Sequence, residues 1–197
     1  MKKLPIFAAC AFSLSGFVSN VQASDINYDY VEVGYTLIND FDASGGVSVS
    51  GSYDIFDNIN VIGSLFVSTS TDSTAFDDID ITTYSLGFGY HSSSSDTLDF
   101  FAEARLLNTD TTATTKGVKV NKDDTGSVMS LGIRSQLNDK VELLGRIDRR
   151  NTDALSETVF TFGGRYERNN KLSFGLEFNT GADNGSETLT ASIRRNF

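Results

Sequence analysis

The sequence predicts an all-β protein: a closed antiparallel transmembrane β-barrel, with ten strands favoured and eight as the alternative. One observation is positive. Segment after segment alternates between apolar and polar residues, the period-two pattern of a strand with one face in lipid and the other in a lumen. The other is negative, because no later stretch approaches the 18 consecutive apolar residues of a spanning helix. Any membrane span must therefore be made of strands.

The N-terminal region has the layout of a secretory signal peptide. Two lysines precede an apolar stretch at 4–18, and a small-residue motif ends at Ala23, where we expect cleavage. This predicts a signal peptide at 1–23 and an outer-membrane β-barrel at 24–197. Cys10 is the one cysteine and would leave with the signal, so the mature chain must gain its stability by closing its hydrogen-bond ladder.

The mature chain is strongly acidic. All 26 acidic residues follow the cleavage site, while two of the 16 basic residues are lost with the signal, which leaves 14 against 26 and a formal charge of −12. Such a charge repels nucleic acid, so we expect no nucleic-acid partner. Nothing in the pattern points to a cofactor.

Ten alternating segments follow one another, each roughly nine to eleven residues long, which suits a tilted strand crossing hydrocarbon. Short polar turns separate alternate pairs, including a serine run at 92–95, and two longer loops are expected at 69–78 and 108–124. The third segment is less regular, because Ile62 and Phe66 share its polar face. In chain order, the expected strands and their apolar rows are 28–37 (Val31 to Leu37), 47–55 (Val47 to Ile55), 59–67 (Ile59 to Val67), 82–90 (Tyr84 to Tyr90), 98–106 (Leu98 to Leu106), 129–137 (Met129 to Leu137), 141–150 (Val141 to Ile147), 160–167 (Phe160 to Tyr166), 172–179 (Leu172 to Phe178) and 187–197 (Leu189 to Phe197).

Alternation alone does not say which row points inward, because a soluble lipocalin-like periplasmic binding barrel also alternates, with its apolar row inside. Two features favour the membrane. The polar row holds Arg and Glu at mid-strand, and the apolar row gathers aromatic residues toward strand ends, as at membrane interfaces. These aromatic residues are Tyr35, Tyr53, Tyr84, Tyr90, Phe100, Tyr166, Phe174 and Phe197.

The charged residues of the polar row are expected to form a network inside the lumen. In a barrel this narrow, opposite charges would neutralise each other as a packed polar core, since an unpaired buried charge is costly. This interpretation predicts a structural or surface-interaction role, and the alternative is a narrow ion or small-solute channel. The expected network contains Glu32, Glu103, Arg105, Arg134, Glu142, Arg146, Asp148, Arg165, Glu167, Glu177 and Arg194.

Catalytic chemistry is not expected. His91 is the single histidine; it closes the expected strand at 82–90 beside the serine run, and adjacent turn residues rarely reach the geometry of a nucleophile and its base. We expect His91 to be an exposed turn residue and the protein not to be an enzyme.

Two expected loops carry charges that could meet partners. The first is acidic but lacks the glycine-centred loop and terminal Glu of a calcium site, so we expect Asp72, Asp77, Asp78 and Asp80 to be solvated. The second is basic, and its residues could contact lipopolysaccharide phosphates together with two arginines nearby. These basic residues are Lys116, Lys119, Lys122, Arg149 and Arg150.

Taken together, the short strands, tight turns, mixed lumen charges and terminal Phe197 resemble the small Gram-negative outer-membrane barrels typified by OmpX and OmpA, although ten strands depart from the eight of OmpX. The segments 28–35 and 84–91 are also similar to small outer-membrane barrels of plant-associated bacteria once discussed as quorum or elicitor factors. The resemblance implies an outer-membrane location, Phe197 as the insertion signal read by the assembly machinery, and membrane lipid and possible lipopolysaccharide as partners. It transfers no binding residue.

Overall fold

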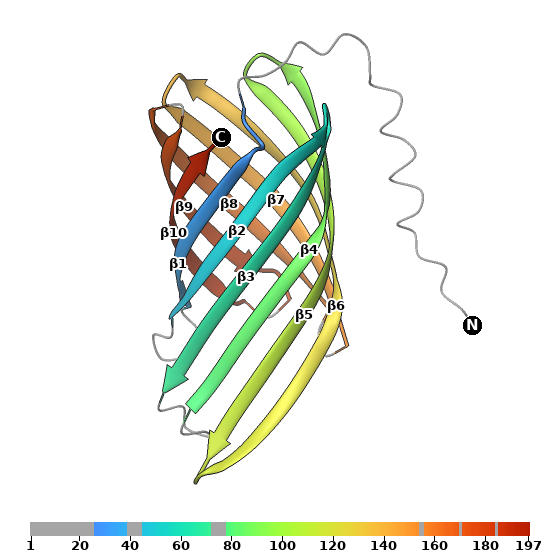
Figure 1. Ribbon diagram of the computed structural model, residues 1–197, viewed down its shortest axis with the longest axis vertical. Coiled ribbons are helices and arrows are strands. Elements are labelled where there is room, and N and C mark those ends of the chain that lie inside the picture. The colour runs from blue at the N-terminus through green and yellow to red at the C-terminus, as the bar shows by residue number, and fades with distance from the viewer. Residues whose placement is uncertain (1–25, 39–44, 72–77, 154–155, 170, 184) are drawn as a thin grey trace, which may run out of the picture.

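The chain folds into a closed antiparallel barrel of ten strands in a computed structural model that describes residues 26–38, 45–71, 78–153, 156–169, 171–183 and 185–197 (Figure 1). Each strand pairs with its neighbours in the chain, and β1 pairs with β10 to close the ring. The ten-strand prediction is confirmed, whereas the predicted signal peptide and its cleavage after Ala23 lie outside the described residues. The strands are β1 (Tyr30–Ile38), β2 (Gly45–Phe56), β3 (Ile59–Thr71), β4 (Asp78–Ser95), β5 (Leu98–Thr115), β6 (Val118–Asn138), β7 (Val141–Thr152), β8 (Ser156–Asn169), β9 (Leu172–Gly181) and β10 (Glu187–Asn196).

The predicted apolar row points outward around the barrel. Leu86 and Phe162, at mid-strand, are 64% and 61% exposed, whereas Thr161, one residue from Phe162, is fully buried in the lumen. Since successive side chains of a strand point to opposite faces, the alternation places one row outside and the other inside. None of the described residues forms a helix long and apolar enough to cross a membrane.

Large apolar side chains also occur in the lumen, next to inward-facing glycines. Phe101 is paired with Gly132, and a Cβ built on this glycine would lie 2.3 Å from the Phe101 ring. A Cβ on Gly46 would meet the ring of Phe66 at the same distance. Glycine at these positions makes room for an inward ring, which explains the irregular alternation of the third strand.

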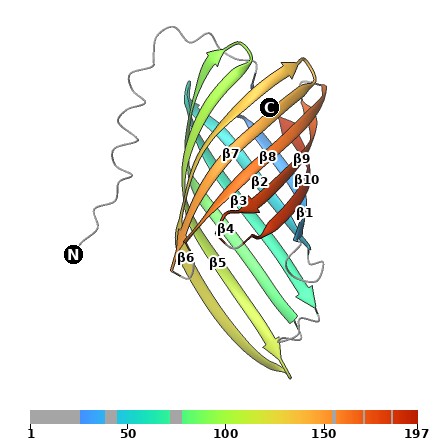
Figure 2. The same ribbon diagram turned by 180° about the vertical axis from the view of Figure 1, so that it is seen from behind.

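The prediction of a long loop at 108–124 is wrong, because these residues form a β-hairpin. β5 and β6 have 18 and 21 residues and continue past the other strands in both ribbon views (Figure 1, Figure 2). Lys116 and Gly117 join them with positive φ angles of 49° and 78°, the backbone of a tight two-residue hairpin turn. The other long loop is narrower than predicted, since β3 runs to Thr71 and β4 begins at Asp78, and residues 72–77 between them are not described.

The two ends of the barrel differ. The end that carries the short turns, here the turn end, also holds Phe197, and the opposite end, the hairpin end, carries the β5–β6 projection. At the turn end β4 continues to Ser95, so the serine run at 92–95 belongs to the strand and not to the predicted turn, which falls at 96–97. At the hairpin end, β7 pairs with β6 only from Gly126 onward.

We expect the folded barrel to survive SDS at room temperature and to migrate differently on a gel after boiling. The closed ladder offers no free strand from which unfolding can start in lipid or detergent, because every strand is paired on both sides. The measurement is a comparison of boiled and unboiled samples of membrane fractions. Recovery of the mature chain as a soluble periplasmic protein would contradict this prediction.

Candidate functional site in the lumen

A buried ion pair joins β6 and β7 near the turn end. Arg134 donates two hydrogen bonds to Glu142, from Nε to Oε1 at 3.0 Å and from Nη2 to Oε2 at 2.8 Å. The two residues are only 7% and 4% exposed. Two parallel charge-assisted bonds of this kind fix the orientation of both side chains as well as neutralising their charges.

Glu32 links three strands across the lumen. Its Oε2 accepts a hydrogen bond from Arg194 Nε at 2.5 Å, and Arg194 is its direct partner on β10. The same oxygen accepts a hydrogen bond from Arg165 Nη2 at 2.8 Å, and Arg165 lies on β8, which β9 and β10 separate from β1 in the ring. Arg165 also lies 3.8 Å from Glu177 on β9. One carboxylate thus holds two arginines inside the barrel.

Further ion pairs lie nearer the middle of the barrel. Arg146 Nε contacts Asp148 at 3.1 Å, and Arg105 Nε contacts Glu103 at 3.5 Å. The Thr161 hydroxyl donates to Asn179 Oδ1 at 2.7 Å and carries the polar network from β8 to β9. These contacts fill the part of the lumen between the Glu32 cluster and the hairpin end with polar atoms.

The structure brings together every residue of the expected lumen network except Glu167. The part of the chain that the structure describes contains no ion pair of Glu167, which lies partly exposed near the end of β8. A cavity of about 50 Å³ remains between the pairs, lined by residues that include Tyr30, Arg134, Arg146 and Glu177. This volume holds only a few water molecules.

The prediction that His91 is an exposed turn residue is wrong. His91 is buried rather than exposed, at 8%, and lies on β4 facing the lumen. Its ring stacks on Tyr28 with centroids 3.8 Å apart and an interplanar angle of 9°, and its Nε2 lies 3.2 Å from Asp54 Oδ1. The alternation could have found this position, since His91 lies two residues after the inward Gly89, but the serines that follow suggested a turn.

The segment before β1, residues 26–29, turns into the mouth of the barrel and is a second feature that the sequence did not reveal. The expected first strand began at Tyr28, whereas β1 begins at Tyr30. Ile26 and Tyr28 are buried, and the Arg134 guanidinium lies 4.6 Å from the centre of the Tyr28 ring, within cation–π range. Arg134 Nη1 also donates to the carbonyl of Asn27 at 3.2 Å. Burial raises the pKa of the Tyr28 phenol, so this side chain stays neutral at physiological pH.

The remaining candidates of the sequence analysis lie at the hairpin end. Asp72 and Asp77 fall outside the described residues, and within the described ranges no three His, Cys, Asp or Glu side chains are grouped to hold a metal ion. Asp80 accepts a hydrogen bond from Thr69. Arg149 lies 3.6 Å from Asp183, and Arg150 lies 3.3 Å from Glu157, so both arginines already have acidic partners.

An outward apolar row, a polar lumen and a ladder closed between first and last strands define a small membrane β-barrel. The chain belongs to the outer membrane protein beta-barrel domain family, whose model matches residues 7–179. It is therefore a protein of the Gram-negative outer membrane, where barrels have short turns toward the periplasm. The turn end is accordingly the periplasmic end.

Solved structures agree with this fold. The KdgM porin in complex with disordered oligogalacturonate has a TM-score of 0.54 at 7% identity, covering 85% of this chain and 99% of its own. The beta domain of the Bordetella autotransporter BrkA has a TM-score of 0.50 at 9% identity, and the match covers 87% of this chain and 100% of that domain. No curated protein matches the sequence. At these identities the likeness shows the fold alone.

We expect Arg134→Ala to lower the free energy of unfolding by about 1 to 4 kcal/mol, because it leaves Glu142 as an unpaired buried carboxylate. The measurement is urea unfolding in lipid or detergent, with Lys140→Ala as the control, since Lys140 is an exposed basic residue in the turn between β6 and β7. Replacing the pair together, as Arg134→Met with Glu142→Leu, should recover most of the loss. Equal stability of Arg134→Ala and Lys140→Ala would show that the pair contributes nothing.

Proposed function

We propose that this protein is a non-enzymatic outer-membrane barrel whose lumen is sealed by its own ion pairs, and that it acts through its structure and its outer surface. The observation that carries the proposal is the bridge from Glu32 on β1 to Arg165 on β8. Because these two strands are separated by β9 and β10 in the ring, the bridge crosses the lumen instead of running along its wall.

The electrostatics of the lumen support a seal. A permeating ion would have to displace paired groups at several levels, the Arg134–Glu142 pair, the Glu32 cluster and the Arg146–Asp148 pair. Each buried group left without its partner costs several kcal/mol. The cavity of about 50 Å³ is far smaller than an open aqueous channel, which agrees with the small diameter of a ten-strand barrel.

The segment 26–29 supports a second closure at the periplasmic mouth. Its Tyr28 ring lies between His91 and Arg134, and Asp29 Oδ1 accepts a hydrogen bond from the backbone N–H of Asp54 at 2.6 Å. This segment enters the lumen from the end opposite the hairpin. The barrel is thus closed by side chains within it and by its own chain at the mouth.

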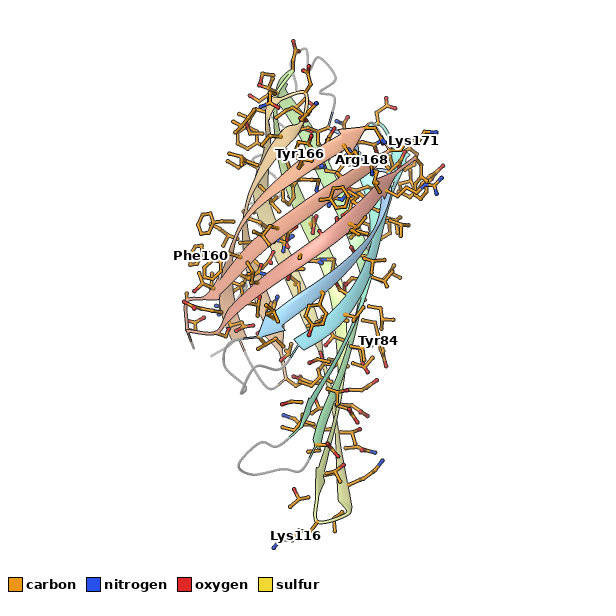
Figure 3. All side chains as sticks on the ribbon, turned by 90° about the vertical axis from the view of Figure 1, so that its left-hand side faces the viewer. Tyr84, Lys116, Phe160, Tyr166, Arg168 and Lys171 are labelled. Carbon is orange, nitrogen blue, oxygen red and sulfur yellow. The ribbon has the colours of Figure 1, made fainter. Side chains whose placement is uncertain are left out.

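The β5–β6 hairpin is the surface on which an outside partner would act. It projects beyond the barrel, with Lys116 at its tip (Figure 3), and Val118 and Val120 are 64% and 60% exposed. Apolar residues exposed on a projecting strand favour contact with another surface. The soluble lipocalin-like alternative is excluded by the outward apolar row and by the family, and the narrow channel is the alternative that the next experiment decides.

We expect purified wild-type protein to give almost no conductance in a planar bilayer. Removing both ends of the crossing bridge, as Glu32→Ala with Arg165→Ala, should raise the conductance above the wild-type value, because the lumen then loses the bridge that crosses it at this level. Arg150→Ala with Glu157→Ala is the matched control, since this pair lies on β7 and β8 near the hairpin end and joins neighbouring strands. Steady, ion-selective steps from the wild-type protein would establish the channel instead.

Catalysis by His91 is not part of the proposal, because its ring is held between Tyr28 and Asp54 as a packing group. We expect His91→Ala to leave any hydrolase or transferase activity of the preparation unchanged and to increase hydrogen exchange at residues 26–29. His91→Phe, which keeps a ring for the stack, should retain the slow exchange. Loss of an activity in His91→Ala would overturn the non-enzymatic assignment.

A further inference from the structure

The basic residues of the mature chain fall into three groups. Five arginines line the lumen, and five basic residues lie at the hairpin end. The rest lie at the periplasmic rim, on the side of the barrel formed by β6 to β10. This rim group consists of Lys140, Arg168, Lys171 and Arg195, all of them exposed.

Three members of the rim group lie close together. Arg195 is on the outer face of β10, directly opposite Leu172 of β9. Lys171 precedes Leu172 and accepts a backbone hydrogen bond from Asn196 at 2.9 Å. Arg168, near the end of β8, lies at the same end of the barrel as Lys171 and Tyr166 and opposite Lys116 (Figure 3). The three cations therefore surround the junction of β8, β9 and β10.

The charges of this rim group are not neutralised by the protein. No ion pair within 4.0 Å connects Arg168, Lys171 or Arg195 to an acidic group of any residue that the structure describes, in contrast to the five lumen arginines. Glu167, the acidic residue next to Arg168 in the chain, is on the lumen face of β8. Three exposed cations at the periplasmic rim can attract negatively charged headgroups of the membrane.

A groove lies beside two of these cations, Lys171 and Arg195. It is open, has a volume of about 460 Å³, and is lined by Asn169, Lys171, Leu172 and Arg195. The outward row continues from it into the membrane with Phe174 on β9 and Ile193 on β10, which are paired and exposed. The groove thus lies between basic side chains at the rim and apolar side chains on the wall. This arrangement matches the charged headgroup and the acyl chains of a lipid.

We propose that this groove binds an anionic glycerophospholipid of the periplasmic leaflet. Arg195 and Lys171, which line the groove, hold the headgroup phosphate, to which arginine can donate two parallel hydrogen bonds, and Arg168 adds positive charge at the same rim. The acyl chains lie along Leu172, Phe174 and Ile193. A zwitterionic lipid would leave more of the positive charge uncompensated, so the site prefers a headgroup with net negative charge. Basic pockets at the rim of membrane proteins recognise acidic headgroups by the same chemistry.

The test uses the full mature chain reconstituted in phosphatidylcholine vesicles with a trace of spin-labelled lipid. Electron paramagnetic resonance measures the fraction of labelled phosphatidylglycerol, and of labelled phosphatidylcholine, that is immobilised by the protein. We expect the wild type to immobilise more phosphatidylglycerol than phosphatidylcholine. In the variant Arg168→Gln/Lys171→Gln/Arg195→Gln this preference should fall at least about fivefold, since one basic residue at an anionic surface accounts for about that factor in binding. Lys116→Gln/Lys119→Gln/Lys122→Gln, which removes the same charge at the hairpin tip, should retain it.

Three results would overturn the proposal: no headgroup preference in the wild type, equal loss in both triple variants, or displacement of the labelled lipid by inorganic phosphate at constant ionic strength. The last would indicate a site for free phosphate. Folding of each variant is checked by its shift on boiling in SDS. If Arg168→Gln/Lys171→Gln/Arg195→Gln does not fold, Arg195→Gln and Arg195→Lys are compared instead. An unchanged preference for phosphatidylglycerol in Arg195→Gln would then overturn the proposal.

Discussion

Backbone N–H and C=O groups find no water in hydrocarbon, and a group left unpaired there costs several kcal/mol. The chain meets this constraint by pairing each strand on both sides, and the last open edge is removed by the β1–β10 ladder. Alternation follows from the same constraint, because a strand whose backbone is satisfied within the wall must turn one row of side chains to lipid and the other inward. The polar lumen is therefore a consequence of closure.

Once a polar row is enclosed, its charges must find partners. Glu32 is central because one carboxylate serves both Arg194 and Arg165 and so connects β1 with β10 and β8. Inward glycines have the complementary role, since Gly132 gives the Phe101 ring space inside. The interior is filled by a mixture of ion pairs and rings whose positions depend on each other, and this explains why the remaining cavity is small.

The local pattern predicted the fold well, because each outward residue is determined by its own strand. Partners across the lumen were not predictable to the same degree. Arg165 meets Glu32 only because of the stagger between strands, which no single segment encodes. The hairpin at 108–124 was missed because threonines fill both of its faces and weaken the alternation, although Gly117 offered a turn signal. His91 was missed because a serine run resembles a turn even when it continues a strand.

Pairing between Tyr30 and Asn196 has a consequence for the order of events during biogenesis. β1 is synthesised before β10 but can close the barrel only by pairing with it. A membrane-embedded barrel with a closed wall therefore cannot form until both strands have been synthesised and exported. Contacts so distant along the chain form slowly. During transit the chain must stay unfolded and soluble, and its acidic charge, which makes separate chains repel each other, favours this over aggregation.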